Sequence, residues 1–387
     1  MLAEILNAYN VSQSALARAV GLHPSSVCRL INGRRTLKTA AHLDALRGYL
    51  LGLGVTAAQL DAALGRANAP EAPNTEPATT ATTEEEDTLM ALRHHSLTPQ
   101  ARQTFGIFRN PFDQPERAED VYLNPAIRYA REALYQAATH GNFLALVGES
   151  GSGKSTLRRE LIDRLDRDNG DVVVIQPYIL NMATRDNGSG KPLRTSHIIE
   201  AILHAVNPSQ ASTGSPERMA RRAHEALKVS SRAGNRHVLI IEEAHDLHTQ
   251  TLKALKRFYE LEDGMRRLLS IILIGQPELA QRLSTSDADV REVVQRIDLV
   301  TLPPLEDVGE FLRQRCAVNG LDADKLFTAD AFAAIKARLL LSRDNRGNAV
   351  DMAYPLAVCN VAAACLNEAA ACGYKQVDAD LATRVRL

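Results

Sequence analysis

The chain has 387 residues, of which 45% are hydrophobic and 24% are charged, and its net charge is −1. This composition excludes a chain that is disordered or collagenous throughout, and the length favours two or three domains. No uninterrupted apolar run approaches the ~18 residues that a membrane span requires, so we expect a cytoplasmic protein with no membrane partner. The five cysteines show no metal-ligand spacing, and any affinity for nucleic acid must come from local basic patches.

Residues 1–66 form a small basic module, with seven lysines and arginines against three acidic residues. Ser12 is suited to cap a first short helix, Gly21 supplies a turn, and Pro24 opens a second helix. This pattern predicts an all-α helix-turn-helix domain that contacts DNA, although a protein-interaction domain with a solvated basic face fits the same residues. The predicted DNA contacts are Ser25, Ser26, Arg29, Arg34, Arg35 and Lys38.

Residues 67–95 differ in composition from both neighbouring segments. Between residues 68 and 87 there are six acidic residues, no basic residue and almost no large apolar side chain. Such a segment cannot bury enough surface to offset the entropy lost on ordering, so we expect a flexible acidic linker.

Short apolar runs alternate with helical patterns between residues 96 and 303, and only helical patterns follow in residues 304–387. The alternation predicts an α/β domain with a parallel sheet covered on both faces, followed by a small helical domain. The predicted strands are Phe143–Val147, Val172–Pro177, Val238–Ile241, Leu268–Ile274 and Leu299–Leu302. The predicted helices are Pro125–Thr139, one beginning at Lys154, Thr251–Leu261, Glu306–Val318, Thr328–Leu341 and Asp351–Cys372, the last with Cys359, Cys365 and Cys372 as small core residues.

The most specific motif is the segment GESGSGKS, which follows an apolar strand and opens a helix. This is the phosphate-loop pattern, with four residues between its outer glycines, in the context that the motif requires. Backbone N–H groups of such a loop converge on the phosphates of ATP, Lys154 adds a positive charge, and Ser155 offers a hydroxyl to Mg²⁺. The sequence therefore predicts a site for ATP and Mg²⁺ formed by Gly148, Glu149, Ser150, Gly151, Ser152, Gly153, Lys154, Ser155 and Thr156.

Two acids, Glu242 and Glu243, follow the apolar run at residues 238–241. Carboxylates at the carboxyl end of a parallel strand point into the crevice where ligands bind. We therefore expect Glu242 to hold Mg²⁺ and Glu243 to orient the attacking water, the alternative being that both acids cap the following helix. His245 and His248 are expected to be solvated or to support the site, because a metal pair would need a third ligand nearby.

Further catalytic candidates lie after the next strand. Gln276 comes just past a central strand, where a polar side chain can touch the γ-phosphate or the attacking water. Arg291 and Arg296 precede the last strand, where an arginine can stabilise transition-state charge on a neighbouring subunit's nucleotide. Arg296 is the preferred candidate, and an ordinary surface ion pair is the alternative.

The motifs GESGSGKS, LIIEEAH and IILIGQPEL, the arginine of QRI and the helical C-terminal region resemble the AAA+ ATPases. With FGIFRNPFDQ, they further resemble a group that includes secretion ATPases of the ExeA type and transposition regulators of the TnsC and phage Mu B types. The N-terminal module resembles the lambda-repressor-like helix-turn-helix family. The resemblance implies an AAA+ P-loop core with a helical lid, preceded by an all-α domain on a flexible linker.

The same resemblance implies a function. Such proteins bind double-stranded DNA with ATP, assemble as homo-oligomeric rings or helical filaments, and deliver target DNA to a transposase that stimulates hydrolysis. Two positions depart from the family pattern, because Glu242 stands where aspartate is usual and Leu356 stands where many lids place a phosphate-sensing arginine. Basic residues that would line the central channel of such an assembly are expected to contact DNA, with solvated charge as the alternative; they are Arg185, Lys191, Arg194, Lys253, Lys256 and Arg257.

Other functions share parts of this pattern. A helicase of the DEAH-box type needs a second motor domain, and the residues after Leu302 contain no further strand-rich core. An Orc-type replication initiator normally carries a winged helix after the lid, and a nucleotide-gated transcription regulator would read an operator with the N-terminal module. We keep the last two as alternatives to the transposition role.

Overall fold

The structure is a computed structural model that describes residues 95–168, 170–178, 193–208, 214–284, 294–340 and 350–385, together with residues 16, 19 and 48–50. The chain divides into two compact units, Met1–Ala78 and Thr79–Leu387. In the first unit, Leu16 and Leu50 are fully buried. The predicted DNA contacts of the helix-turn-helix and residues 67–94 of the predicted acidic linker lie outside the described residues. The last linker residue, His95, donates its backbone N–H to the Asn360 side chain at 3.2 Å.

Five parallel strands form the central sheet of the second unit, in the order β2-β3-β6-β1-β7. Their bounds are β1 Phe143–Val147, β2 Val172–Ile175, β3 Arg236–Ile241, β6 Ser270–Gly275 and β7 Ile297–Thr301. The predicted parallel sheet is confirmed, and no strand end differs from its predicted position by more than two residues. Strand β1 lies between β6 and β7, with Val147 opposite both Gly275 and Thr301.

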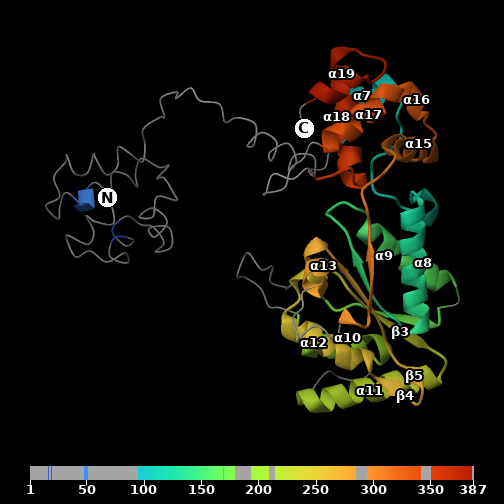
Figure 1. Ribbon diagram of the computed structural model, residues 1–387, viewed down its shortest axis with the longest axis vertical. Coiled ribbons are helices and arrows are strands. Elements are labelled where there is room, and N and C mark those ends of the chain that lie inside the picture. Colours follow the sequence, from blue (N-terminus) through green and yellow to red (C-terminus); the bar gives the residue numbers. More distant parts are fainter. Residues whose placement is uncertain are drawn as a thin grey trace. The chain divides into compact units, whose positions relative to one another are not determined.

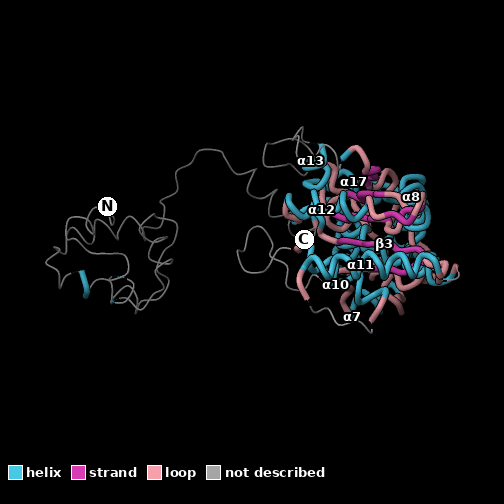
Figure 2. Tube along the Cα trace, turned by 90° about the horizontal axis from the view of Figure 1, so that it is seen from below, coloured by secondary structure: helices cyan, strands magenta, loops and turns pink. Residues whose placement is uncertain are grey.

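Helices cover both faces of this sheet, as Figure 2 shows. One face carries α8 (Pro125–His140) and α9 (Lys154–Arg167), and the other carries α10 (Thr195–Val206), α11 (Pro216–Arg232), α12 (Thr249–Tyr259) and α13 (Pro277–Ser284). On β1, Leu144 and Leu146 face the first pair of helices. Phe143, Ala145 and Val147 face the second group. Because successive residues of a strand point to opposite faces, a strand covered on both sides needs the unbroken apolar sequence FLALV.

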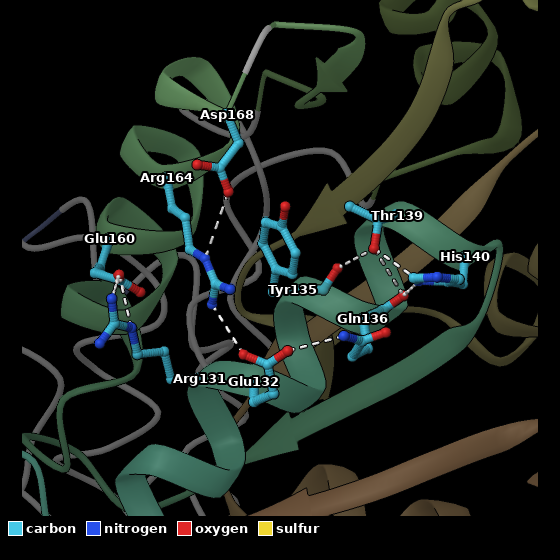
Figure 3. Close-up of polar contacts among 9 residues, drawn as sticks. All are labelled: Arg131, Glu132, Tyr135, Gln136, Thr139, His140, Glu160, Arg164 and Asp168. Atoms are coloured by element: carbon cyan, nitrogen blue, oxygen red, sulfur yellow. Dashed lines mark hydrogen bonds and ion pairs between the residues drawn. The ribbon is translucent and has the colours of Figure 1, made fainter.

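Polar contacts hold α9 against α8 (Figure 3). Arg131 of α8 pairs with the buried carboxylate of Glu160 of α9 at 2.7 Å. Arg164 of α9 lies 3.1 Å from Glu132, and its guanidinium is 3.6 Å from the centroid of the Tyr135 ring. A buried carboxylate is costly unless it is paired, so the contact between Arg131 and Glu160 fixes the position of α9, which begins in the phosphate loop.

A short hairpin precedes β6 and was not predicted. Its strands are β4 (Glu262–Asp263) and β5 (Arg266–Arg267), which pair antiparallel. Gly264 has a φ of +64° and makes the turn between them. In Figure 1 the hairpin lies at the end of the core that is farthest from the C-terminal helices.

The predicted helical lid follows the sheet and is present. It contains α15 (Val308–Val318), α16 (Ala323–Leu326), α17 (Ala329–Leu340), α18 (Pro355–Cys372) and α19 (Ala379–Arg384). A further helix, α7 (Pro99–Phe105), packs among them although it precedes the sheet in sequence (Figure 1). The side-chain amide of Asn367 fixes its start by accepting a hydrogen bond from the Thr98 N–H at 2.8 Å. The segment predicted as the ATPase core therefore contributes its first helix to the lid.

Helix α18 forms the centre of the lid. By length and composition it is apolar enough to cross a membrane, and 67% of that stretch is buried in the fold. Burial raises the pKa of the Cys359 and Cys365 thiols to about 12, as expected of small core residues. The prediction for Cys372 is wrong, because this residue is exposed in the last turn, where the helix leaves the core.

Candidate active site

The phosphate loop joins β1 to α9 at the carboxyl edge of the sheet. The N–H of Gly148 donates to the carbonyl of Gly275 at 3.3 Å, which holds the start of the loop beside the end of β6. Gly153 is the N-cap of α9, and it has no side chain to cap the first turn. The first N–H groups of α9, at the positive end of the helix dipole, are therefore placed to bind a phosphate.

Lys154 is the charged group of this loop. Its ammonium donates to the carbonyl oxygens of Gly148 and Glu149, both at 2.7 Å. Burial lowers the pKa of Lys154, and the nearby carboxylates, Glu243 first, oppose that change. An ammonium that has lost part of its water interacts more strongly with an anion than an exposed one does. The other predicted loop residues surround it, with Ser150 and Ser155 exposed, Glu149 and Thr156 half-buried, and Ser152 buried.

Gly151 is the point at which the lid touches the phosphate loop. The N–H of Leu356, in the first turn of α18, donates to the Gly151 carbonyl at 3.2 Å. A Cβ at position 151 would lie 2.5 Å from the Cβ of Leu356, and the φ of Gly151 is +77°. Only glycine allows both the left-handed backbone and this close approach. Leu356 therefore contributes packing, and no charge, at a position where many AAA+ lids place an arginine.

A cavity of about 320 Å³ opens beside the loop, between the core and the lid. Residues 151–156 of the loop line it together with Leu356, which touches Gly151, and with Asp113, Gln114, Arg159 and Arg315. Further apolar side chains of the lining form its apolar end, namely Phe112, Val121, Tyr122, Ile127, Phe311, Pro355 and Cys359. Tyr122 donates its hydroxyl to Glu310 at 3.0 Å and meets the Phe311 ring edge-on, with 5.3 Å between the centroids. Burial, and then this hydrogen bond, raise the pKa of Tyr122 to about 12. A cavity that combines a phosphate loop with apolar side chains matches the chemistry of a nucleotide, which carries both phosphates and a flat base.

Arg315 of α15 joins the lid to the segment that precedes α8. Its buried guanidinium donates to the carbonyls of Pro111 at 3.0 Å and Asp120 at 3.2 Å, and also to that of Asp113. A buried cation needs such acceptors, and these carbonyls meet around it in only one arrangement of the segment. Arg315 therefore fixes the apolar end of the cavity.

Glu242 and Glu243 end β3 in different surroundings. Glu242 lies 3.1 Å from the Nε of Arg158, one turn after Lys154 on α9. Glu243 is 57% exposed and has a φ of +48°, the one positive value among the described non-glycine residues. That conformation costs about 1 to 3 kcal/mol and is typical of functional sites. Glu243 is thus held, accessible to water, beside the phosphate loop.

His245 connects this acidic edge to Gln276. Its Nδ1 accepts a hydrogen bond from the Gln276 N–H at 3.4 Å and lies 3.5 Å from a carboxylate oxygen of Glu243. Arg282 of α13 donates to the carbonyls of His245 and Leu247 at 2.5 and 2.6 Å. The ends of β3 and β6 therefore meet at His245, which accepts from the Gln276 backbone and lies beside Glu243. His248 lies apart at the N-cap of α12, where it is exposed.

The residues expected to hold Mg²⁺ fit its preference for oxygen ligands. Ser155 is exposed in the first turn of α9, and the Glu242 side chain is 25% exposed. Within the described ranges, no group of three or more His, Cys, Asp and Glu side chains forms a metal site. Mg²⁺ is usually bound through one or two protein ligands together with substrate phosphates.

Arg296 lies just before β7 and contacts its own chain. Its guanidinium pairs with Glu260 at the end of α12, and both side chains are partly exposed. The surface ion pair considered from sequence is therefore present, and the role of Arg296 toward a neighbouring subunit stays a prediction. Arg291 lies outside the described residues.

The predicted channel-lining residues are only partly described. Lys253 and Lys256 are half-buried and Arg257 is exposed on α12. Arg194 is exposed at the N-cap of α10, and the Thr251 hydroxyl of α12 donates to the Leu193 carbonyl at 2.7 Å, which places the start of α10 beside α12. The two remaining candidates, Arg185 and Lys191, lie outside the described residues.

Several residues of this site were not predicted from the sequence. Arg158 is one helical turn after the phosphate loop, so its spacing from Lys154 was a usable signal. The apolar end of the cavity and Arg315 had none, because three segments far apart in sequence build that end. Of these, the segment FGIFRNPFDQ carries only a family resemblance.

Comparisons with known proteins agree with this geometry. Residues 137–283 match the family model described as an AAA domain. The chain is 28% identical over 244 residues to general secretion pathway protein A of Aeromonas hydrophila, across 60% of this chain and 40% of that protein. This chain therefore spans less than half the length of that curated relative.

Solved structures are also similar to this chain. Cdc6p of Pyrobaculum aerophilum has 16% identity and a TM-score of 0.49, covering 70% of this chain and 68% of that one. The ORC2 protein of Aeropyrum pernix has 17% identity and a TM-score of 0.45, covering 72% and 71%. The region matched by the family model contains the phosphate loop, the acidic end of β3 and Gln276. The chain therefore has an AAA+ P-loop α/β core, within which residues 137–283 are similar to an AAA domain.

Proposed function

We propose that the protein is an ATP-dependent DNA-binding ATPase that assembles on double-stranded DNA and delivers target DNA to a transposase. The observation that carries the ATPase part is that Lys154, Glu243 and Gln276 share one edge of the sheet, beside a cavity with an apolar end. The transposition part is supported by the motifs that resemble transposition regulators. A cytoplasmic location belongs to the same proposal.

Each residue of the site has a distinct task in this proposal. Lys154 and the first N–H groups of α9 bind the phosphates of ATP. Glu243 orients the attacking water and accepts its proton, and the strained backbone holds its carboxylate in place. Gln276 contacts the γ-phosphate or that water. Mg²⁺, when bound with ATP, neutralises phosphate charge, and Ser155 and Glu242 would hold it.

Imaging tests the assembly step. With double-stranded DNA and ATP, negative-stain micrographs should show rings or filaments, and these should be absent with ADP or without nucleotide. Filaments that form equally well in all three conditions would contradict the ATP dependence.

A truncated chain tests the N-terminal module. A chain that starts at Ser96 keeps the buried Leu97 and the Thr98 cap of α7, so the lid should fold. It should still assemble on DNA with ATP but bind less tightly, because a tethered module adds effective concentration and no structural support. Complete loss of assembly would show that residues 1–95 are structural.

The basic surface of α12 supports the DNA part of the proposal. Lys253, Lys256 and Arg257 are spaced so that they share one side of the helix, and Arg194 lies at the neighbouring start of α10. Replacing one phosphate contact should reduce the slope of log affinity against log salt by about 0.9. The variants Lys256→Ala and Arg194→Ala test this, with Arg167→Ala on the far face of α9 as control. Unchanged slopes in both would remove these residues from the DNA surface.

A shared active site is tested by mixing subunits. To act on the nucleotide of a neighbouring subunit as an arginine finger, Arg296 must leave its ion pair with Glu260 of its own chain. An arginine finger raises the rate of hydrolysis by about 10³ to 10⁵. Lys154→Ala and Arg296→Ala subunits should each be nearly inactive, and their mixture should recover part of the DNA-stimulated hydrolysis. No recovery, with co-assembly confirmed, would exclude action across subunits.

A secretion role is the second candidate, because the curated relative is named general secretion pathway protein A. DNA separates the two roles, since duplex should stimulate hydrolysis in a transposition regulator and leave a secretion ATPase unaffected. Neighbouring genes give an independent test. An integrase-like transposase gene next to this one would support the proposal, and a set of secretion genes would contradict it.

A further inference from the structure

A second cavity opens at the amino edge of the sheet. Its volume is about 590 Å³, and it lies among the starts of β3 and β6, the end of α8 and the β4–β5 hairpin. The fourteen described residues that line it include Arg236, Arg266 and Arg267, and none of the fourteen is Asp or Glu. The cavity wall is therefore strongly positive.

The guanidinium groups of this cavity keep donors available. Arg236 donates to the carbonyl of Thr139 at 2.9 Å, and Arg266 donates to that of Ser231 at 3.3 Å. In the described part of the chain, neither guanidinium lies within ion-pair distance of a carboxylate. Each has five N–H donors, and these contacts use a minority of them. Both arginines therefore retain charge and hydrogen-bonding capacity for a ligand.

The acids of the hairpin do not neutralise this wall. Arg232, which does not line the cavity, donates two hydrogen bonds to the Asp263 carboxylate at 2.8 and 2.9 Å. Glu262 lies 3.9 Å from Arg267, whose guanidinium also rests 4.1 Å from the centroid of the Tyr259 ring. Among the described residues, the ion pair of Glu262 with Arg267 is thus the one contact of a carboxylate with the three arginines of this cavity.

Buried His237 lines the cavity, and its pKa is lower than that of a free histidine. Burial lowers its pKa, and the charge of Arg266 lowers it further. The imidazole is held by the Leu268 carbonyl at 3.0 Å and the Ser230 hydroxyl at 2.9 Å. It therefore forms a fixed floor to the cavity.

This cavity is separate from the nucleotide site. Arg236 begins β3 and Glu242 follows its end, so a strand of six residues, about 17 to 20 Å, lies between the two edges. Figure 1 shows the hairpin at the end of the core opposite to the lid. A ligand here does not compete with ATP.

We propose that the amino-edge cavity binds phosphate groups of a nucleic-acid backbone. Arginine forks match phosphate oxygens, and several converging forks suit a chain of phosphates. Apart from two imidazoles the described lining has no aromatic ring. It therefore lacks the apolar and aromatic side chains with which the first cavity can hold the base of a nucleotide. Fully exposed Met265, next to Arg266 at the hairpin tip, adds an apolar side chain of the kind that enters a DNA groove.

The proposal rests on DNA binding in the proposed function and adds a contact surface far from ATP. It is tested with Arg266→Gln/Arg267→Gln in the full-length protein, using a fluorescein-labelled duplex, ATP and a series of KCl concentrations. The slope of log affinity against log salt should fall by about 2, since each lost contact removes about 0.9. Arg266→Lys/Arg267→Lys should keep most of the slope because the charge remains.

A control variant removes arginines that lie outside the amino-edge cavity. Arg167→Gln/Arg384→Gln removes two exposed arginines that pair with acids on their own helices, and it should leave the slope unchanged. Basal ATP hydrolysis should be wild-type in every variant, and Arg236→Gln provides a second test through another element if the double variant does not fold. An unchanged slope in the double and the Arg236 variants overturns this inference alone. Absence of duplex binding by the wild type overturns both it and the proposed function.

Pyrophosphate and a polyglutamate peptide test whether the cavity binds a ligand other than DNA. If the double Gln variant lost binding of pyrophosphate but kept the duplex slope, the cavity would take free phosphates. If it lost binding of a polyglutamate peptide but kept the duplex slope, the partner would be an acidic protein. Either result overturns the proposal.

Discussion

The two edges of one sheet present opposite chemistries. At the carboxyl edge Lys154 is half-buried in a cavity that is also lined by apolar side chains and by Arg159 and Arg315, and α18 of the lid touches the loop through Leu356. At the amino edge three exposed arginines surround a polar cavity. A desolvated charge is strong at short range and is screened little by salt, whereas exposed charges act at longer range and are screened. The first edge is thus suited to select one ligand, and the second to attract an extended anion.

The largest effect is expected from removing the buried charge. Lys154→Ala should weaken ATP binding by about 100-fold or more and abolish hydrolysis, because losing a charged donor in such a site costs about 3 kcal/mol. Titration with a fluorescent ATP analogue measures this. Lys325→Ala removes an exposed lysine paired with Asp322 on the lid and is the matched control. Equal ATP affinity of the two variants would contradict the predicted role of Lys154.

The second largest effect is expected on ATP hydrolysis, with ATP binding left nearly unchanged. Glu243→Gln should bind ATP almost normally, but single-turnover hydrolysis should fall by about 10² to 10⁴ because the general base is lost. The variant should also stay on DNA longer than the wild type. Release from DNA at the wild-type rate would show that hydrolysis is not the release step.

A smaller effect tests the contact between lid and loop. Gly151→Ala combines a left-handed backbone with a Cβ placed 2.5 Å from Leu356, so its free energy of unfolding should fall by about 2 to 4 kcal/mol. Gly106→Ala has a similar φ of +64° and nothing within 4 Å, so it should lose only about 1 kcal/mol. Denaturant unfolding compares the two. Equal losses would show that the lid does not press on the loop.

The smallest effect concerns the floor of the amino edge. The pKa of His237 is lowered by burial, so on acidification through about pH 6.5 the unfolded chain takes up a proton before the folded one does. Stability contributed by neutral His237 is therefore present above that pH and is lost as the pH falls toward the lowered value. His237→Gln should make the decline of unfolding free energy between about pH 7.5 and 5.5 shallower. An unchanged slope would contradict this assignment.

Local signals predicted most of the sheet and the phosphate loop. Apolar runs bounded by glycine and charged residues mark strands well, because a parallel strand covered on both faces must be apolar throughout. The loop glycines, Lys154 and Ser155 are contiguous in sequence, so their geometry follows from a single turn. The β4–β5 hairpin was not predicted, and neither were the helices α7, α10, α11, α13, α16 and α19.

The sequence by itself determined the chemistry that lies within one turn or at one strand end, namely the phosphate loop, Glu242, Glu243 and Gln276. Tertiary structure decided what comes from distant segments. It placed α7 in the lid, paired Arg158 with Glu242 and Arg296 with Glu260, and left Cys372 exposed. It also gathered arginines from the start of β3 and from the hairpin into one cavity. The physical reason is that hydrophobic periodicity reports which side chains are buried, whereas ion pairs and cavities depend on which buried elements become neighbours.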